Sequence, residues 1–105
     1  MVSKTVEMTS LERRAGEVAA VLKSLSNARR LLMLCKLAEH GKLSVGQLAE
    51  AVGLSQSALS QHLAVMREEK LVAFDRDGQT LHYRIADERL NDLLGSLYRI
   101  YCTTD

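Results

Sequence analysis

Apolar residues recur at helical spacing through the first two thirds of the chain, and each periodic segment follows a residue that can cap a helix. Thr9 and Glu12, for example, have the spacing of a capping box, in which each side chain satisfies a free backbone N–H. Residues 1–8 show no such period and are predicted to form a flexible tail before a single domain at residues 9–105. The segments predicted as helices are Leu11–Leu25, Arg29–Glu39, Val45–Val52 and Gln56–Lys70.

The period of the apolar positions changes after Lys70 from about 3.6 residues to about 2, which is typical of strands. Leu71–Asp75 and Thr80–Ile85 are predicted to form a hairpin around Arg76–Gln79, whose Asp-Gly pair is a strong turn signal. Asp87 then caps a last helix. This order predicts a mainly α fold with a small β-hairpin wing, a winged helix-turn-helix of five helices. The apolar stripe of the last helix consists of Leu90, Leu93, Leu94, Leu97, Tyr98 and Tyr101.

The composition fits one globular domain, because 105 residues carry 14 Lys and Arg against 13 Asp and Glu. This balance excludes a histone-like polymer binder and an acidic tail. No apolar run approaches the roughly 18 residues of a membrane span, and the N-terminus lacks the apolar core of a secretory signal, so we expect a cytoplasmic protein. In that reducing compartment, the two cysteines are expected to be free, redox-active or metal-binding rather than a structural disulfide.

The short turn Gly53-Leu54-Ser55 joins two predicted helices in a way that lets the second helix enter a DNA major groove. The start of that helix carries short polar side chains that suit base edges and phosphates, and the wing tip can reach the flanking backbone or the minor groove. An alternative is that these residues only solvate an exposed face or contact protein. The predicted DNA contacts are Gln56, Ser57, Ser60, Gln61, His62, Arg67, Arg76 and Gln79, with Arg84 as a further cation.

The patterns of an enzyme active site are missing from the sequence. It contains no Ser-His-Asp grouping, no Gly-rich phosphate loop and no paired catalytic carboxylates. Asp87-Glu88 at a helix start is explained by the helix dipole. We therefore expect a DNA-binding protein rather than an enzyme.

Three segments of the chain resemble the ArsR family of bacterial repressors: LSNARRL at 25–31, LSVGQL at 43–48 and LSQSALSQHL at 54–63. The wing residues Gly78-Gln79-Thr80 and Tyr83 also fit. The resemblance implies a homodimeric winged-helix repressor whose first and last helices pair across the two-fold axis. It also implies that Ser57, Ser60, Gln61 and His62 lie where the family contacts operator DNA.

The metal-binding positions of the family lack their ligands in this chain. Ser44-Val45-Gly46 replaces a thiol pattern, and Asp87-Glu88-Arg89 lacks the His of the last-helix pattern. The three histidines lie on three different predicted elements, whereas a zinc site needs about three or four converging donors. We therefore predict no metal and no other cofactor, and a metal-sensing repressor is kept as an alternative.

Cys35 and Cys102 have 66 residues between them and no local chelating or CxxC spacing. Taken alone, Cys35 fits a small apolar residue of a buried helix, and Cys102 fits an incidental thiol near the chain end. Together with the segment Leu97–Cys102, they resemble the sulfide- and redox-sensing branch of the family that includes BigR, SqrR and HlyU. The resemblance implies that the two thiols face each other within a protomer and become linked by an oxidant or a reactive persulfide.

We therefore expect a homodimeric repressor whose operator binding is switched off when reactive sulfur species or an oxidant link Cys35 to Cys102. The first nucleophile is Cys102, by its exposure, or Cys35, if a cation such as Arg99 lowers its pKa. The bridge is a disulfide, which requires Cα atoms within about 7 Å, or a longer polysulfide that tolerates a wider gap. A non-sensing DNA-binding anti-silencer is a further alternative.

Overall fold

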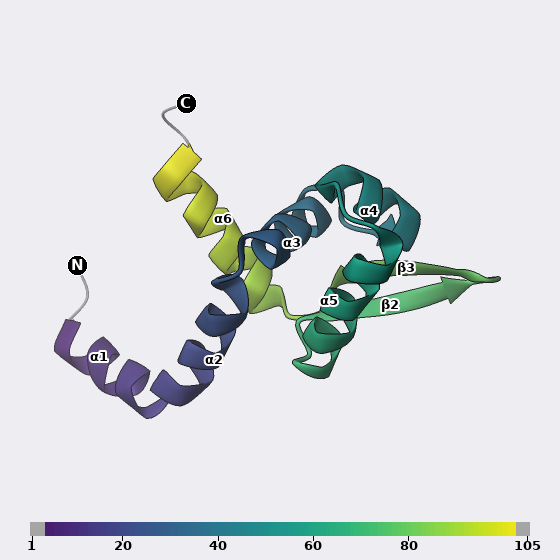
Figure 1. Ribbon diagram of the computed structural model, residues 1–105. Coiled ribbons are helices and arrows are strands. Elements are labelled where there is room, and N and C mark those ends of the chain that lie inside the picture. Colours follow the sequence, from purple (N-terminus) through teal and green to yellow (C-terminus); the bar gives the residue numbers. More distant parts are fainter. Residues whose placement is uncertain (1–3, 103–105) are drawn as a thin grey trace.

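The computed structural model describes residues 4–102, and within this range the chain forms six helices and a small antiparallel sheet (Figure 1). The predicted winged helix-turn-helix is confirmed, with six helices in place of the predicted five. None of the described helices has the length and apolarity needed to cross a bilayer. The elements are α1 (Lys4–Arg13), α2 (Ala15–Leu25), α3 (Ala28–His40), β1 (Leu43–Ser44), α4 (Val45–Val52), α5 (Gln56–Glu68), β2 (Val72–Asp77), β3 (Thr80–Ile85) and α6 (Glu88–Cys102).

The N-terminal segment differs from the predicted flexible tail and single helix. α1 begins at Lys4, and Arg14 (φ −103°, ψ 7°) separates it from α2, so that the two helices meet at an angle (Figure 1). Thr9 therefore lies inside α1 and is not an N-cap. The helix includes residues 4–8 because they contain neither Pro nor Gly to interrupt its backbone hydrogen bonds, although they lack an apolar period. Residues 1–3 of the predicted tail lie outside the described residues.

The helix-turn-helix follows the predicted caps closely. The Asn27 side chain accepts hydrogen bonds from two backbone N–H groups in the first turn of α3, at 2.9 and 3.1 Å. Ser44 and Gln47 form a complete capping box at the start of α4, and Gly53 ends that helix in the left-handed conformation (φ 72°). Ser55 Oγ accepts a backbone N–H of α5 at 3.1 Å. Gly53 and Ser55 thus set where α4 ends and where α5 begins.

The wing is longer than predicted, and α5 is shorter. α5 ends at Glu68 because the backbone turns left-handed at Lys70 (φ 64°) before entering β2. Asp77 pairs with Thr80, so the tip is the two-residue turn Gly78-Gln79 rather than the predicted four residues. Gly78 has a φ of 63°, which a glycine adopts without strain. The short strand β1, which was not predicted, pairs with β3 and gives the strand order β1-β3-β2.

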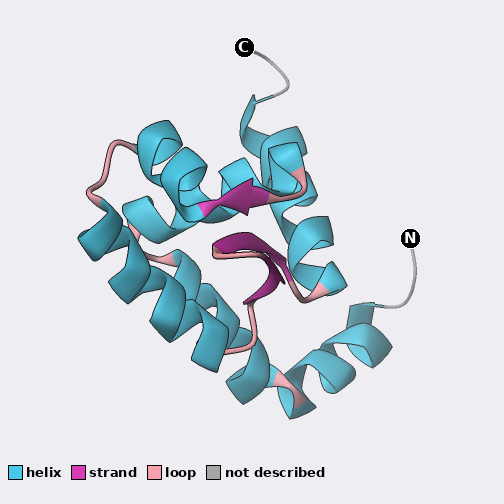
Figure 2. Cartoon of the chain, turned by 90° about the vertical axis from the view of Figure 1, so that its right-hand side faces the viewer, coloured by secondary structure: helices cyan, strands magenta, loops and turns pink. Residues whose placement is uncertain are grey.

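The core lies among α3, α4, α5, the sheet and the first half of α6. A view from the end of the wing shows the strands with helices around them (Figure 2). The second half of α6 extends past this core (Figure 1), so that Tyr98 and Tyr101, the last members of the predicted apolar stripe, are 63% and 73% exposed. The buried apolar side chains are Leu25, Met33, Leu34, Leu37, Leu48, Ala49, Leu59, Leu63, Met66, Leu71, Val72, Tyr83, Leu90 and Leu94.

Candidate functional sites: a DNA-reading face and a thiol pair

The exposed side of α5 carries most of the polar residues predicted to contact DNA. Leu59, Leu63 and Met66 anchor the other side of this helix in the core. The exposed residues have short or flexible side chains with both donors and acceptors, which can bond to base edges and to phosphates. We call them the reading face: Gln56, Ser57, Ser60 and Gln61.

His62 is half-buried beside the reading face and has a partner inside the protein. Its Nδ1 atom accepts a hydrogen bond from Nε of Arg30, in the first turn of α3, at 3.4 Å. The two residues are 32 positions apart. Sequence reasoning missed this pair because no local pattern marks a contact between residues so far apart in the chain.

Arg67, another predicted DNA contact, is exposed but also packs against the wing. Its guanidinium carbon lies 5.3 Å from the centre of the Phe74 ring, and its Nη1 atom donates a hydrogen bond to the Tyr83 hydroxyl at 3.4 Å. The two aromatic rings contact each other, with their centres 5.4 Å apart. Arg67 therefore ties the end of α5 to both long strands of the wing.

The outer part of the wing presents Arg76 and Gln79, which are both exposed. Arg84, the further cation named from the sequence, forms an ion pair with Asp75 at 3.3 Å, and Lys42 pairs with the same carboxylate at 2.8 Å. The hydrogen bond from Lys42, reinforced by Arg84, lowers the pKa of Asp75. The charge of Arg84 is thus partly compensated within the protein.

Both cysteines are free thiols, and they line one open hollow between α3 and the end of α6. The exposures of the two thiols are the reverse of those expected: Cys35, which taken alone fits a small apolar residue of a buried helix, is exposed, whereas Cys102, named as first nucleophile for its exposure, is half-buried. Helices from opposite ends of the chain thus bring the two thiols to one place. The hollow has a volume of about 350 Å³, and its other lining residues are Leu31, Leu94, Leu97, Tyr98 and Tyr101.

The pKa of Cys35 is raised above its ordinary value of 9.0. Partial burial of its thiol is the largest cause, followed by the negative charges of Cys102 and Glu39, while Lys36 opposes the shift. The effect of Cys102 means that the two sulfur atoms lie within electrostatic reach of each other. The cation that opposes the shift is therefore Lys36 and not Arg99, whose Nη2 atom donates to the Ser96 hydroxyl at 2.8 Å.

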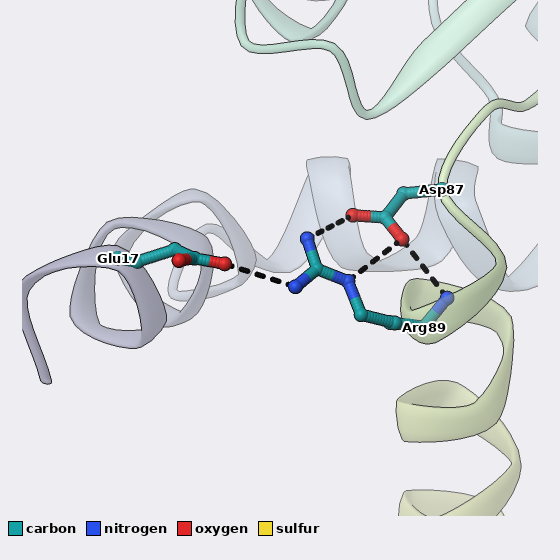
Figure 3. A network of polar contacts seen from close by, with 3 residues as sticks. All are labelled: Glu17, Asp87 and Arg89. Atoms are coloured by element: carbon teal, nitrogen blue, oxygen red, sulfur yellow. Dashed lines mark hydrogen bonds and ion pairs between the residues drawn. The ribbon is translucent and has the colours of Figure 1, made fainter. Parts of the chain in front are cut away.

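Arg89 joins α2 to the start of α6 (Figure 3). Its Nη1 atom donates to Glu17 at 2.9 Å, while Nη2 and Nε donate to Asp87 at 3.0 and 3.2 Å. Asp87 also accepts the backbone N–H of Arg89, which confirms the predicted cap. The hydrogen bonds from Arg89 lower the pKa of Asp87. Sequence reasoning missed Glu17, which is 72 positions from Arg89.

Within the part of the chain that the structure describes, no group of three or more His, Cys, Asp or Glu side chains could hold a metal ion. At the start of the last helix, the position that would require a histidine is occupied by Arg89, which is already paired with the two carboxylates beside it.

Several large apolar side chains are exposed on the terminal helices and on α3. α1, α2 and α6 lie at the end of the molecule away from the wing (Figure 1). We call these side chains the terminal apolar face: Met8, Leu11, Leu22, Leu32, Tyr98, Ile100 and Tyr101.

The family pattern and the similar proteins found by comparison all point to the same family. The sequence pattern that defines the bacterial regulatory protein, arsR family, matches residues 27–73. The chain is 43% identical over 96 residues to the HTH-type transcriptional regulator YgaV of Escherichia coli K12, which covers 91% of this chain and 97% of YgaV. It is 37% identical over 97 residues to the transcriptional activator HlyU of Vibrio cholerae, covering 92% of this chain and 89% of HlyU.

A crystal structure gives the same result for the fold. The transcriptional repressor BigR from Xylella fastidiosa, 40% identical, matches with a TM-score of 0.85 over 91% of this chain and 97% of that chain. These likenesses span the helix-turn-helix, the wing and most of the terminal helices. The chain therefore belongs to the ArsR family of bacterial regulatory proteins and is a winged-helix, DNA-binding transcriptional regulator.

Proposed function

We propose that this chain is a homodimeric repressor that leaves its operator when reactive sulfur species or an oxidant link Cys35 to Cys102. The observation that carries the proposal is that two free thiols from opposite ends of the chain line one hollow. Cys35 lies on α3, which packs against α4 of the DNA-binding unit, whereas Cys102 ends α6 of the terminal apolar face. A covalent link would therefore join the reading unit to the surface proposed for dimerisation.

The terminal apolar face supports the homodimer. Tyr98, Ile100 and Tyr101 are each more than 60% exposed in a single protomer, and large exposed apolar side chains at one end of the molecule favour an interaction surface there. A two-fold dimer also satisfies the need for two reading helices, because one helix-turn-helix contacts few base pairs. In such a dimer, the two α5 helices read half-sites about one helical turn apart.

The DNA contacts are assigned to the reading face, His62, Arg67 and the wing. We expect the reading face to lie against base edges and phosphates in the major groove, with Arg76 and Gln79 on the flanking backbone or in the minor groove. Because the net charge is only +1, affinity must depend on a few placed cations. Arg67, on α5, and Arg76, on β2 of the wing, are the cations assigned to this role.

One persulfide molecule, RS–SH, is sufficient to oxidise the two thiols to a disulfide. The Cys102 thiolate attacks the outer sulfur of RS–SH, which forms a cysteine persulfide and releases RS⁻. The Cys35 thiolate then attacks the sulfur bonded to Cβ of Cys102, which forms a disulfide and releases HS⁻. If the cysteine persulfide first takes a second sulfur atom from another RS–SH, attack on the middle sulfur leaves a trisulfide instead. Each thiol loses its proton to solvent before it attacks.

Cys102 is assigned as the first nucleophile. The raised pKa of Cys35 lowers its thiolate fraction near neutral pH, and the thiolate is the attacking form. Cys35 then acts as the resolving thiol in the second step.

The link can release DNA because it changes how α3 and α6 sit together. α6 carries part of the proposed dimer surface, so a shift of α6 relative to α3 changes the separation or the angle of the two α5 helices. Moving an operator from mostly bound to mostly free requires a change in affinity of roughly 10²–10⁴. This corresponds to about 3–5.5 kcal/mol of coupling between the thiol pair and DNA.

The experiment that tests the proposal combines intact mass with DNA binding. An operator is first selected from a random duplex library with the reduced wild-type chain. The protein is then treated with glutathione persulfide, diamide or hydrogen peroxide. Its intact mass is measured, and its binding to the selected operator is measured by fluorescence anisotropy. We expect a linked species without alkylatable thiols and loss of operator binding in the wild type, and retained binding in Cys35→Ser and Cys102→Ser.

Two results would contradict the proposal. Either both thiols remain alkylatable after every treatment, or the single variants lose DNA as readily as the wild type does. A gain of whole sulfur atoms identifies a polysulfide bridge and a sensor of reactive sulfur, whereas a loss of two hydrogen atoms with every reagent identifies a general disulfide switch.

Activation of transcription is a second candidate for the effect of this chain on its target genes. The similar protein BigR is a repressor, whereas HlyU of Vibrio cholerae is an activator. The same DNA-binding chain can therefore raise expression by displacing another DNA-binding protein, as an anti-silencer. A reporter placed under the selected operator distinguishes the two, because deletion of the gene for a repressor raises expression and deletion of the gene for an anti-silencer lowers it.

A further inference from the structure

The hydrogen bond between Arg30 and His62 determines which nitrogen of the imidazole carries the proton. Nε of Arg30 donates to Nδ1 of His62 at 3.4 Å, and a guanidinium has no acceptor. Nδ1 must therefore offer its lone pair. The neutral ring then carries its proton on Nε2, the nitrogen that Arg30 does not engage.

Arg30 is held in place from its own helix. Asn27 caps α3 by accepting the backbone N–H groups of Arg29 and Arg30, which anchors Arg30 in the first turn. Both Arg30 and His62 are half-buried, so their side chains have little freedom to leave the pair. The imidazole is consequently oriented by a residue of α3, although it belongs to the helix that carries the reading face.

We propose that Arg30 is a positioning residue for DNA recognition, which holds His62 as a hydrogen-bond donor through Nε2–H toward an acceptor on DNA. The proposal rests on the DNA contacts assigned above to α5. Acceptors of this kind are the guanine O6 and N7, adenine N7 and thymine O4 atoms in the major groove, and the phosphate oxygens. Without Arg30, the ring is free to place its proton on Nδ1, and the same edge then presents an acceptor that DNA acceptors do not bond.

The first test compares matched variants on the operator selected with the wild-type chain. Arg30→Lys keeps the charge but loses the Nε donor, and Arg29→Lys is the control at the exposed neighbouring position. We expect Arg30→Lys to weaken operator binding about 3- to 10-fold for each reading helix, the equivalent of one hydrogen bond, and Arg29→Lys to have a much smaller effect. In the His62→Gln background, where the amide can supply a donor without Arg30, the effect of Arg30→Lys should largely disappear.

The second test reads the tautomer in the free protein. Long-range ¹H–¹⁵N NMR spectra of the imidazoles distinguish a protonated Nε2 from a protonated Nδ1. We expect His62 to be protonated on Nε2 in the wild type and in Arg29→Lys, and to become a mixture of tautomers in Arg30→Lys. Circular dichroism and thermal unfolding establish that each variant is folded.

The outcomes separate the inference from the proposed function. A loss confined to the operator identifies a base acceptor, and an equal loss on random duplex identifies a phosphate acceptor, and both support the proposal. An unchanged tautomer in Arg30→Lys, or an equal effect of Arg30→Lys with and without His62, overturns it. If the wild-type chain selects no duplex at all, the DNA contacts assigned to α5 fail, whereas the tautomer measurement still decides the role of Arg30.

Discussion

Replacing Ile100 by Ala should weaken dimerisation without disturbing the fold of the protomer. Ile100 lies near the end of α6 and is 70% exposed, so it contributes little to the core of one chain. Full burial of an isoleucine side chain is worth about 1.5–3 kcal/mol, so covering the exposed part contributes about 1–2 kcal/mol per protomer. A two-fold interface contains the residue twice.

The alanine variant retains one of the four side-chain carbons of isoleucine, which reduces the loss. We expect dimerisation to weaken by roughly 1.5–3 kcal/mol, or about 10- to 200-fold in the dissociation constant. Sedimentation velocity over a concentration series measures this constant directly. The thermal unfolding of the two proteins should be compared at a concentration at which both are monomeric, where their midpoints should coincide.

Val65→Ala is the matched control, because Val65 is also apolar and 40% exposed but lies on α5, outside the terminal apolar face. Its dimerisation constant should equal that of the wild type. If Ile100→Ala dimerises as tightly as the wild type, or if Val65→Ala shows the same loss, the assignment of the dimer interface to the terminal apolar face is wrong.

Three further predictions follow from the caps and the shifted pKa values. Asn27→Ala removes the acceptor for two backbone N–H groups of α3 and should lower the unfolding free energy by about 1 kcal/mol in urea titrations; no change would contradict the cap. The pKa of Asp87 is lowered from 3.8, so the ionised carboxylate stabilises the folded protein above pH 3.8. This stabilisation is lost as the pH falls through the lowered pKa. Asp87→Asn should therefore lower the urea midpoint at pH 7 but not near pH 2, and a difference that persists in acid would refute this. For Cys35, the midpoint of alkylation by iodoacetamide against pH should lie above 9.0 and fall in Cys102→Ser; an equal midpoint would mean that the thiols do not interact.

The parts of the fold that the sequence predicts best are those with local causes. The start of α4 depends on Ser44, and the boundary between α4 and α5 depends on Gly53 and Ser55, whose side chains or backbone angles act within a few residues. The break at Arg14 and the pairing of β1 with β3 were not predicted, because neither has a local signal. A two-residue strand, in particular, exists only because a partner strand lies beside it.

The features of the candidate sites also divide into those with a local cause and those that depend on the folded chain. The exposure of Ser57 and Gln61 follows from helical periodicity, since the core positions of α5 lie on the opposite side. The exposure of Cys35 does not follow, because α3 is apolar on most sides and the sequence cannot say which side faces the core. The contacts of Arg30 with His62 and of Arg89 with Glu17 join distant segments, so only the folded chain reveals them.

The packing of Arg67 between α5 and the wing has a consequence for how the operator is organised. Because one guanidinium contacts Phe74 and Tyr83, α5 and the wing should move as one rigid body. The number of base pairs between those contacted by α5 and those contacted by the wing tip is then constant within each half-site. A base pair inserted between the two half-sites should consequently weaken binding less than one inserted within a half-site. Movement of one protomer relative to the other can accommodate the first insertion but not the second.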